Sequence, residues 1–394
     1  MTDDPLAAAA RRVLRANDTG RWTVPSRARH PHQWSWDSAF VAIGLAALAW
    51  DRAAAEVDAI LAARWREGML PHVRYDTRRP TGSFPGPNRW PRAQAHVADS
   101  AVRTSGIASP PIVVTAALLV GRRQPDRERR LAFWRRTYRG LLGCLEHLAT
   151  ARRLPDSPLV AVVHPWERGW DGPPDGDGHL VLAELLDEAD YDVATYREVS
   201  AFCVNDVLMD ALWYRAARDL GEIAGELGEP APFARGRLDE FAAAFEERHW
   251  DPELGVYVDW DCAAARRVAT PTAAGVAALA GGLIGVGRAR AAWERHRDLA
   301  SDREPVRAPV SWLVAGGLDG CAMPGEAARV RAETLDLVRR AGFAECFDPV
   351  SGAARGAGEC SATAAVTIDL LDQEASASRR SSSGGSAMVP GVRE

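Results

Sequence analysis

One loop of the chain combines carboxylates with large aromatic rings where regular structure breaks down. The segment HPWERGWDGPPDGDG, residues 164–178, holds Trp166, Glu167 and Asp171 among prolines and glycines that exclude a helix or a central strand. A carboxyl group beside a tryptophan is partly desolvated, which raises its pKa and keeps it protonated as a general acid. The Asp-Gly pairs at the end of the segment are typical of turns and predict solvated acids there.

A second segment, HPHQWSWDSAF at 30–40, places Trp34, Trp36 and Asp37 where a loop meets an apolar helix. Two interpretations stay open. Asp37 could cap the helix by accepting amide hydrogens of the first turn, with the two indoles as packing residues. Alternatively, the flat rings could stack on a sugar while the carboxylate accepts its hydroxyl hydrogens.

Two further loops each contain one residue suited to catalysis or binding. In GMLPHVRYD, residues 68–76, His72 could bind a hydroxyl group or serve as a structural histidine. In GFAECFDPVSG, residues 342–352, Glu345 could be a solvated loop acid or, held between aromatic side chains, a general base. The local sequence does not decide either case.

The motifs of cofactor and phosphate chemistry are missing. The sequence has no HExxH, no GxxxxGK[ST] and no glycine fingerprint between a strand and a helix, so we expect neither a cofactor nor a metal ion. The formal net charge of -5 argues against nucleic acid as a partner, since phosphate binding needs a clustered basic surface. A small molecule is the expected ligand, and a homo-oligomer is left open.

Helical periodicity dominates the chain, and the pattern predicts an all-α protein. The only clear strand signal is the short alternation at 255–258. Helices are expected at 4–16, 37–49, 51–68, 110–121, 127–151, 179–188, 200–227, 231–249, 272–284, 287–299, 308–319, 325–341 and 361–374. The connections at 17–36, 69–109, 152–178, 188–199 and 342–360 are long and rich in Gly, Pro, Trp and acids, which favours functional loops.

Composition along the chain predicts one domain, residues 1–375, followed by a disordered Ser/Gly-rich tail, residues 376–394. The acidic N-terminus lacks the pattern of a signal peptide, and the longest apolar run, 39–50, is shorter than the roughly 20 residues that span a bilayer. The six cysteines are scattered without a CxxC pair, as in reduced core residues. We therefore expect a cytoplasmic protein without a membrane partner.

Taken in order, eight segments resemble glycoside hydrolases of family 63, above all the mannosylglycerate and glucosylglycerate hydrolases, and more distantly trehalases. The segments are HQWSWDSAF, GMLPH, SPP at 109–111, WERGWDGPPDGD, CVNDVLMDAL, APVSWLV, FAECFDP and CSATAAVTIDLL. They extend over residues 30–374, nearly the whole region predicted to fold. Single motifs of this kind are moderately specific, but eight in the family's order form a specific pattern.

The resemblance implies a fold, a reaction and a site. The fold is an (α/α)6 barrel with long functional loops at one end, which agrees with the number of helices predicted above. The reaction is inverting hydrolysis of a small α-glucoside or α-mannoside, in which Asp171 corresponds to the general acid and Glu345 to the general base. The pocket would be lined by Trp34, Trp36, Asp37, His72, Trp166, Glu167 and Trp312.

The chain departs from the family pattern at positions expected to contact substrate. The replacing residues are Ser109, Gly172, Pro173, Arg307, Ser311, Cys346 and Ala362. Both proposed carboxylates are retained, but the identity of the sugar and of its aglycone stays open. Two alternatives also stay open: a barrel that binds a sugar without cleaving it, and a sugar isomerase or lyase on the same type of barrel.

Overall fold

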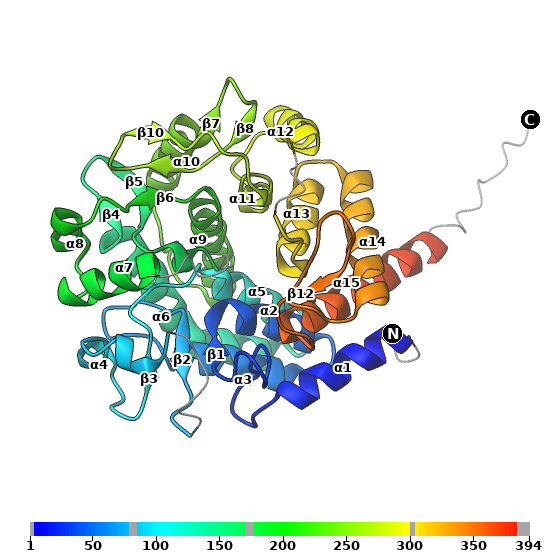
Figure 1. The fold of residues 1–394 in the computed structure, drawn as a ribbon. Helices are drawn as coiled ribbons and strands as arrows, with labels where there is room; N and C mark the ends of the chain where they lie inside the picture. The colour runs from blue at the N-terminus through cyan, green and yellow to red at the C-terminus, as the bar shows by residue number, and fades with distance from the viewer. Residues whose placement is uncertain (1–3, 79–84, 170–176, 300–303, 384–394) are drawn as a thin grey trace, which may run out of the picture.

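The computed structural model describes residues 4–78, 85–169, 177–299 and 304–383, and their helices form two concentric rings (Figure 1). In the inner ring each helix contacts the next one in chain order, and the last helix returns to the first. The inner ring consists of α2 (Ser35–Ala46), α5 (Ile112–Arg122), α9 (Val207–Leu227), α11 (Ala273–Ala277) continued by η3 (Ala278–Gly281), α13 (Ala308–Gly320) and α15 (Ser361–Ser383).

Each inner helix pairs with one helix of the outer ring, and α5, α9 and α15 also contact a second outer helix. Five outer helices directly follow their inner partner in the chain, whereas α1 comes first in the sequence and packs on α15, the last helix. The outer ring consists of α1 (Pro5–Asn17), α3 (Trp50–Leu61), α6 (Arg127–Thr150), α10 (Arg235–His249), α12 (Val286–Leu299) and α14 (Pro324–Ala341). The six pairs make an (α/α)6 barrel, which confirms the predicted fold class.

All inner helices begin at the same end of the barrel. Short turns such as 47–49 and 321–323 join an inner helix to the outer helix that follows, so paired helices run antiparallel. Long segments such as 62–111 and 342–360 then lead back to the start of the next inner helix. We call the end at which the inner helices begin the loop end, and the opposite end the turn end.

The long segments of the loop end form small antiparallel sheets. Strands β1 (Gln33–Trp34), β2 (Val73–Tyr75) and β3 (Arg103–Thr104) pair in the order β1-β2-β3. A five-stranded sheet has the order β10-β9-β6-β5-β4, and two hairpins pair β7 with β8 and β11 with β12. Their bounds are β4 Arg153–Leu154, β5 Ser157–Val162, β6 Val204–Asn205, β7 Trp250–Asp251, β8 Val256–Tyr257, β9 Trp260–Asp261, β10 Arg266–Arg267, β11 Cys346–Phe347 and β12 Ala354–Arg355.

The inner helices are apolar because protein surrounds them on all sides. Ten of the twelve residues of α2 are buried, from Ser35 to Leu45, which explains the apolar run seen in the sequence. The outer helices bury one stripe, as α6 does with Leu131, Leu141 and Leu145. Within the described residues, no helix combines the length and apolar character needed to cross a membrane.

The two ends of the chain are tied together beside α1 and α15. The Asn17 side-chain amide, at the end of α1, donates to the Glu359 carbonyl at 2.8 Å and to the Ser361 hydroxyl at 2.9 Å. The Ser361 hydroxyl donates in turn to the Val24 carbonyl at 2.7 Å, and its backbone N–H donates to the Pro25 carbonyl. These buried hydrogen bonds fix the loop before α2 to the start of α15 and close the ring.

The expectation that Asp37 caps its helix is wrong. Helix α2 begins at Ser35, with Trp34 as the N-cap residue, so Asp37 lies inside the first turn. The helix starts early because the Ser35 backbone N–H donates to the His72 carbonyl and the Ser35 hydroxyl donates to the Pro71 carbonyl. Asp37 is therefore left with its carboxylate available for other contacts at the loop end.

Several other helices and strands differ from the predicted ones. The predicted connections 69–109 and 188–199 contain the short helices α4 (Ala93–His96) and α8 (Val193–Val199), and α7 spans Asp177–Glu188. The strand predicted near 255–258 is present as β8, but the six-residue β5 was missed. Helix α15 continues to Ser383, beyond the expected end at 374, and the rest of the predicted tail, 384–394, lies outside the described residues.

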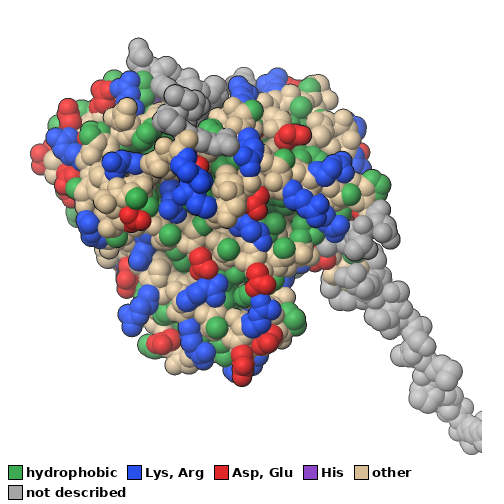
Figure 2. Space-filling view, turned by 90° about the horizontal axis from the view of Figure 1, so that it is seen from below, with side chains coloured by type: hydrophobic (Ala, Val, Ile, Leu, Met, Phe, Trp, Pro, Cys, Tyr) green, Lys and Arg blue, Asp and Glu red, His purple; other side chains and the backbone are tan. Residues whose placement is uncertain are grey.

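The surface mixes both signs of charge. On the face shown in Figure 2, arginines and carboxylates are interspersed rather than gathered by sign. Many of them pair across neighbouring helices, as Arg136 of α6 does with Asp58 of α3 at 3.0 Å. Exposed pairs of this kind contribute about 0–1 kcal/mol each, so they add little to stability.

Candidate active site

Trp34 and His72 meet at the loop end through the pairing of β1 with β2. The register places Trp34 opposite Val73, directly after His72. The Trp34 indole contacts the His72 imidazole edge to face, with ring centroids 4.8 Å apart, and the His30 imidazole in the same way at 5.2 Å. His72 is buried and Trp34 is partly exposed. The structure thus brings together two residues that the sequence placed in separate segments.

Asp37 lies beside His30 and His72, and the pKa of its carboxyl group is raised. Burial raises the pKa of its carboxyl group to about 7, and the negative charge of Glu345 raises it further, against the opposing effect of His30 and His72. Residues from three distant segments therefore act on one carboxyl group. The cluster thus shifts the pKa of Asp37 toward neutral pH.

Glu345 is held in the ionised form. Burial by itself would raise the pKa of its carboxyl group, but hydrogen bonds from His30 and the Ala357 backbone N–H, together with the charges of His30 and Arg307, lower it to about 2. The Glu345 Oε2 atom lies 2.8 Å from the Ala357 nitrogen and 3.4 Å from the His30 Nε2. Gly356 takes a left-handed backbone conformation beside this carboxylate, and a Cβ there would approach Oε2 to 2.6 Å.

His30 is a site residue that sequence reasoning missed. It lies inside a segment that the sequence singled out, but nothing local distinguishes it from His32. In the structure His32 is buried and its Nδ1 accepts the Asp76 backbone N–H at 3.0 Å, whereas His30 reaches Glu345. Only the tertiary fold separates the structural histidine from the one at the site.

The segment before Asp171 is anchored by Glu167. This carboxylate is 1% exposed and accepts hydrogen bonds from the Ala108 and Val163 backbone N–H groups, both at 2.9 Å. It also forms an ion pair with the buried Arg152 at 2.7 Å. Asp171 itself, the predicted general acid, lies outside the described residues.

Trp36 and Trp166 also lie around this segment. Trp166 belongs to the short helix η2 (Pro165–Arg168) and is buried, with its ring 4.7 Å from that of His164. Trp36 packs against Gly169 so closely that a Cβ at this glycine would come within 2.7 Å of the indole. The Trp36 indole therefore lies against the segment that leads to Asp171.

A charge network with buried acids joins the same segment to α9, and no local pattern in the sequence predicts it. Arg168 Nε lies 2.7 Å from Asp206 Oδ2, and the same guanidinium pairs with Asp259. Asp206 is also the N-cap of α9, where it accepts the Leu208 and Met209 N–H groups. Burial raises the pKa of Asp206 to about 6 despite the nearby Arg168.

Trp312 connects the site to the turn end rather than to the loops. Its ring packs edge to face on Phe40, 5.7 Å away, and Phe40 contacts Trp36 at 5.0 Å. The indole N–H donates to Asp369 at 2.7 Å, where Trp312 and Asp369 line a cavity of about 240 Å³ together with Arg123. Trp312 thus links the aromatic residues of α2 to this second cavity.

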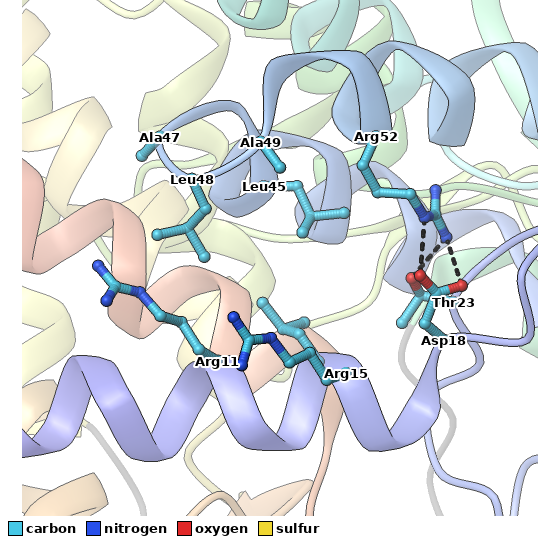
Figure 3. Close-up of a pocket in the computed structure, with 10 residues that line it drawn as sticks. Arg11, Arg15, Asp18, Thr23, Leu45, Ala47, Leu48, Ala49 and Arg52 are labelled. Atoms are coloured by element: carbon cyan, nitrogen blue, oxygen red, sulfur yellow. Dashed lines mark hydrogen bonds and ion pairs between the residues drawn. The ribbon is translucent and has the colours of Figure 1, made fainter.

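A larger cavity, about 520 Å³, contains none of the predicted site residues. It lies between α1 and the turn that joins α2 to α3 (Figure 3). Its polar residues are Arg11, Arg15, Asp18, Thr23 and Arg52, and its wall is aliphatic. Because the acids and histidines suited to catalysis gather at the other end of α2, we locate the candidate active site at the loop end.

The arrangement at the loop end suits acid–base chemistry. One carboxylate is held ionised, a second has a pKa near 7, and His30, His72 and the Trp34 indole lie beside them. Within the described residues, no group of three or more His, Cys, Asp or Glu side chains is placed to hold a metal ion. These residues can activate water and bind a polar, ring-shaped substrate.

Comparison with known proteins agrees with this geometry. Residues 30–309 match the family model described as the mannosylglycerate hydrolase MGH1-like glycoside hydrolase domain. A mannosylglycerate hydrolase of Thermus thermophilus is 32% identical, over 90% of this chain and 98% of the relative. A glucosylglycerate hydrolase of Mycolicibacterium hassiacum is 31% identical, over 94% of this chain and 98% of the relative.

A solved structure shows the same fold. A family 63 mannosylglycerate hydrolase of Thermus thermophilus, crystallised with Tris and D-glycerate, superposes with a TM-score of 0.84 at 30% identity. The match covers 93% of this chain and all of that one. The chain is therefore a glycoside hydrolase, and it belongs to the mannosylglycerate hydrolase MGH1-like family.

Proposed function

We propose that the enzyme hydrolyses glucosylglycerate, mannosylglycerate or a closely related small α-glycoside with inversion of the anomeric centre. Asp171 is the general acid and Glu345 the general base. The observation that carries this assignment is the ionised Glu345 beside Asp37, His30 and His72 at the loop end. The names of the relatives support the glycerate glycosides as the substrate class.

In the proposed reaction a water molecule attacks the anomeric carbon while the bond to the leaving oxygen breaks. Glu345 takes a proton from the water, and Asp171 gives its proton to the leaving oxygen. Because an inverting enzyme must fit this water between base and sugar, its two carboxyl groups stand roughly 6.5–9.5 Å apart. Glu345 is ready for its role, since its lowered pKa keeps it ionised at neutral pH.

The other site residues receive different roles. Trp34, His72 and Asp37 are proposed to contact the sugar, with Asp37 accepting a hydroxyl hydrogen. Glu167 is proposed to anchor the segment before Asp171, because protein donors already occupy both of its oxygens. Trp36, Trp166 and Trp312 are proposed to form the aromatic wall and floor behind the sugar-contacting residues.

Proton NMR of the reaction tests this function. Glucosylglycerate and mannosylglycerate are compared with glucosylglycerol, which is a matched control because it lacks only the carboxylate. An inverting α-glycosidase releases the β-anomer first, and the glycerate glycosides should be preferred. Asp171→Asn and Glu345→Gln should each lower kcat/KM by about 10²–10⁴-fold, the usual contribution of acid–base catalysis.

Other outcomes would select the alternatives. Release of the α-anomer first would indicate a retaining mechanism, and unchanged activity of both variants would remove the two residues from catalysis. Binding without any product would indicate a sugar-binding barrel. A product with the same mass as the substrate would indicate an isomerase.

The compartment is a further part of the proposal. All six cysteines are free thiols, and five of them are buried. Buried free thiols are typical of a reducing compartment, so we propose that the enzyme acts in the cytoplasm. Cell fractionation that finds the activity outside the cytoplasm would contradict this assignment.

A further inference from the structure

The His30 imidazole contacts the carboxylate of Glu345, the proposed base. The His30 Nε2 atom lies 3.4 Å from Glu345 Oε2, which also accepts the Ala357 backbone N–H. No hydrogen bond to Glu345 Oε1 is found within the described residues. The two side chains are 30% and 34% exposed, so both can be reached by water or substrate. One oxygen is thus occupied by protein donors and the other is left for water.

The position of His30 is itself fixed. Its backbone N–H donates to the Ser26 carbonyl at 2.9 Å, and Ser26 and His30 form an isolated β-bridge. Its ring packs edge to face against the Trp34 indole. The imidazole is therefore presented to Glu345 by a closed turn and an aromatic contact, as a positioning residue requires.

Charges from three elements act on the pair. Asp37 from α2 and Glu345 itself raise the pKa of His30, against burial and the nearby Arg29, which lower it. Arg307 at the start of α13 acts on Glu345 in the same direction as His30. His72 acts on Asp37 from the strand side of the cluster. His30 is the only one of these groups for which a hydrogen bond to Glu345 is found within the described residues.

We propose that His30 is a positioning residue for the base: it holds Oε2 of Glu345 and so turns Oε1 toward the hydrolytic water. This role rests on the proposed function of Glu345. It predicts that the acidic limb of the pH profile depends on His30. Without the imidazole, burial acts on Glu345 with less opposition, so its carboxyl group takes up a proton at higher pH.

The first experiment compares pH profiles of kcat/KM for His30→Phe and His30→Gln. Phenylalanine keeps the ring contact with Trp34 but removes the hydrogen bond, whereas glutamine keeps a donor without a titrating group. His30→Phe should lower kcat/KM by up to about 100-fold, the cost of a misplaced catalytic group. Its acidic limb should move to higher pH, and His30→Gln should recover part of the rate.

A matched control uses another histidine that pairs with carboxylates. His96 lies 3.4 Å from Glu67 and 3.2 Å from Asp190, away from the proposed base. His96→Phe should leave the acidic limb where it is in the unaltered enzyme. A loss in His30→Phe that is equal at every pH would assign His30 a merely structural role and overturn the proposal.

The second experiment does not depend on activity. The imidazole of His30 is titrated by NMR in the full chain and in Glu345→Gln. Its pKa should fall when the Glu345 charge is removed, and an unchanged titration would show that the two groups are not paired. If Glu345→Gln retains activity while the His30 titration shifts, the pair exists but the proposed function of Glu345 fails.

Discussion

The loop end and the turn end of the barrel treat their charges in opposite ways. Beside α13 and α15, charged groups of the turn end lie in matched pairs: Arg123 bonds Asp369 and Asp372, and Arg331 bonds Asp319. At the loop end like charges are brought together, and Glu345, although it pairs with His30, also raises the pKa of another acid, Asp37. The inner helices thus lead from ion pairs of opposite charge at the turn end to a cluster at the loop end in which two acids lie close together.

The difference shows where the fold is stabilised and where it is used. Matched pairs leave no charge for a ligand, so the turn end is suited to holding the ring together. An unbalanced cluster costs free energy of folding but supplies groups with altered acidity, as reactive sites do. The loop end also contains matched pairs, among them the fully buried pair of Arg152 with Glu167, which lies on the segment before Asp171.

The largest effect is expected from breaking that buried pair. Arg152→Met leaves the Glu167 charge buried without compensation, which typically costs about 3–5 kcal/mol of unfolding free energy. Chemical denaturation measures the loss, and the double variant with Glu167→Gln should recover much of it. The surface variant Arg136→Met is the control, with an expected loss of about 0–1 kcal/mol. If Arg152→Met and Arg136→Met lowered the unfolding free energy equally, Glu167 would not anchor this segment.

A smaller effect is expected for Trp312, which the sequence assigned to the substrate pocket. Trp312→Phe keeps the ring contact with Phe40 but removes the hydrogen bond to Asp369, at a cost of about 1–3 kcal/mol in stability. KM should stay within about twofold if the residue belongs to the turn end. A large rise in KM with unchanged stability would place Trp312 among the sugar-contacting residues instead.

The only gain in stability is expected for Asp37→Asn. The pKa of Asp37 is about 7 in the folded chain against an ordinary value of 3.8, so the folded chain binds its proton more tightly. Stability from this group is present below about pH 4 and is lost as the pH rises toward 7. Asparagine does not ionise, so Asp37→Asn avoids the stability that the unaltered enzyme loses as Asp37 gives up its proton. The Tm of the variant should therefore exceed that of the unaltered enzyme at pH 8 but not at pH 4.

Activity should fall in the same Asp37 variant, because the proposed hydroxyl acceptor is weakened. The control is Asp239→Asn, whose carboxyl group is exposed on α10 and makes a 3.9 Å pair with Arg235. Its Tm should not depend on pH in this way. If Asp37→Asn raised the Tm equally at pH 4 and pH 8, the gain would not come from the titration of Asp37.

The helices could be predicted from the sequence, because a buried stripe repeats along each of them and needs no knowledge of its partner. Strand β5 could not, because five of its six residues are buried and show no alternation. The juxtaposition of Asp37 and Glu345 has no signature in spacing and came only from the family resemblance. The burial of Glu167 depends on Arg152 and on backbone groups elsewhere in the chain, so no local pattern reveals it.

The closure of the inner ring has a consequence for the order in which the protein can be made. Helix α2 lies between α5 and α15, so one of its buried flanks is covered only by the last helix to be synthesised. Until residues 359–361 leave the ribosome, Asn17 lacks the Glu359 carbonyl and the Ser361 hydroxyl to which its side chain donates. The nascent chain therefore carries an apolar flank of its first hairpin through most of translation, when it is open to chaperones and to aggregation.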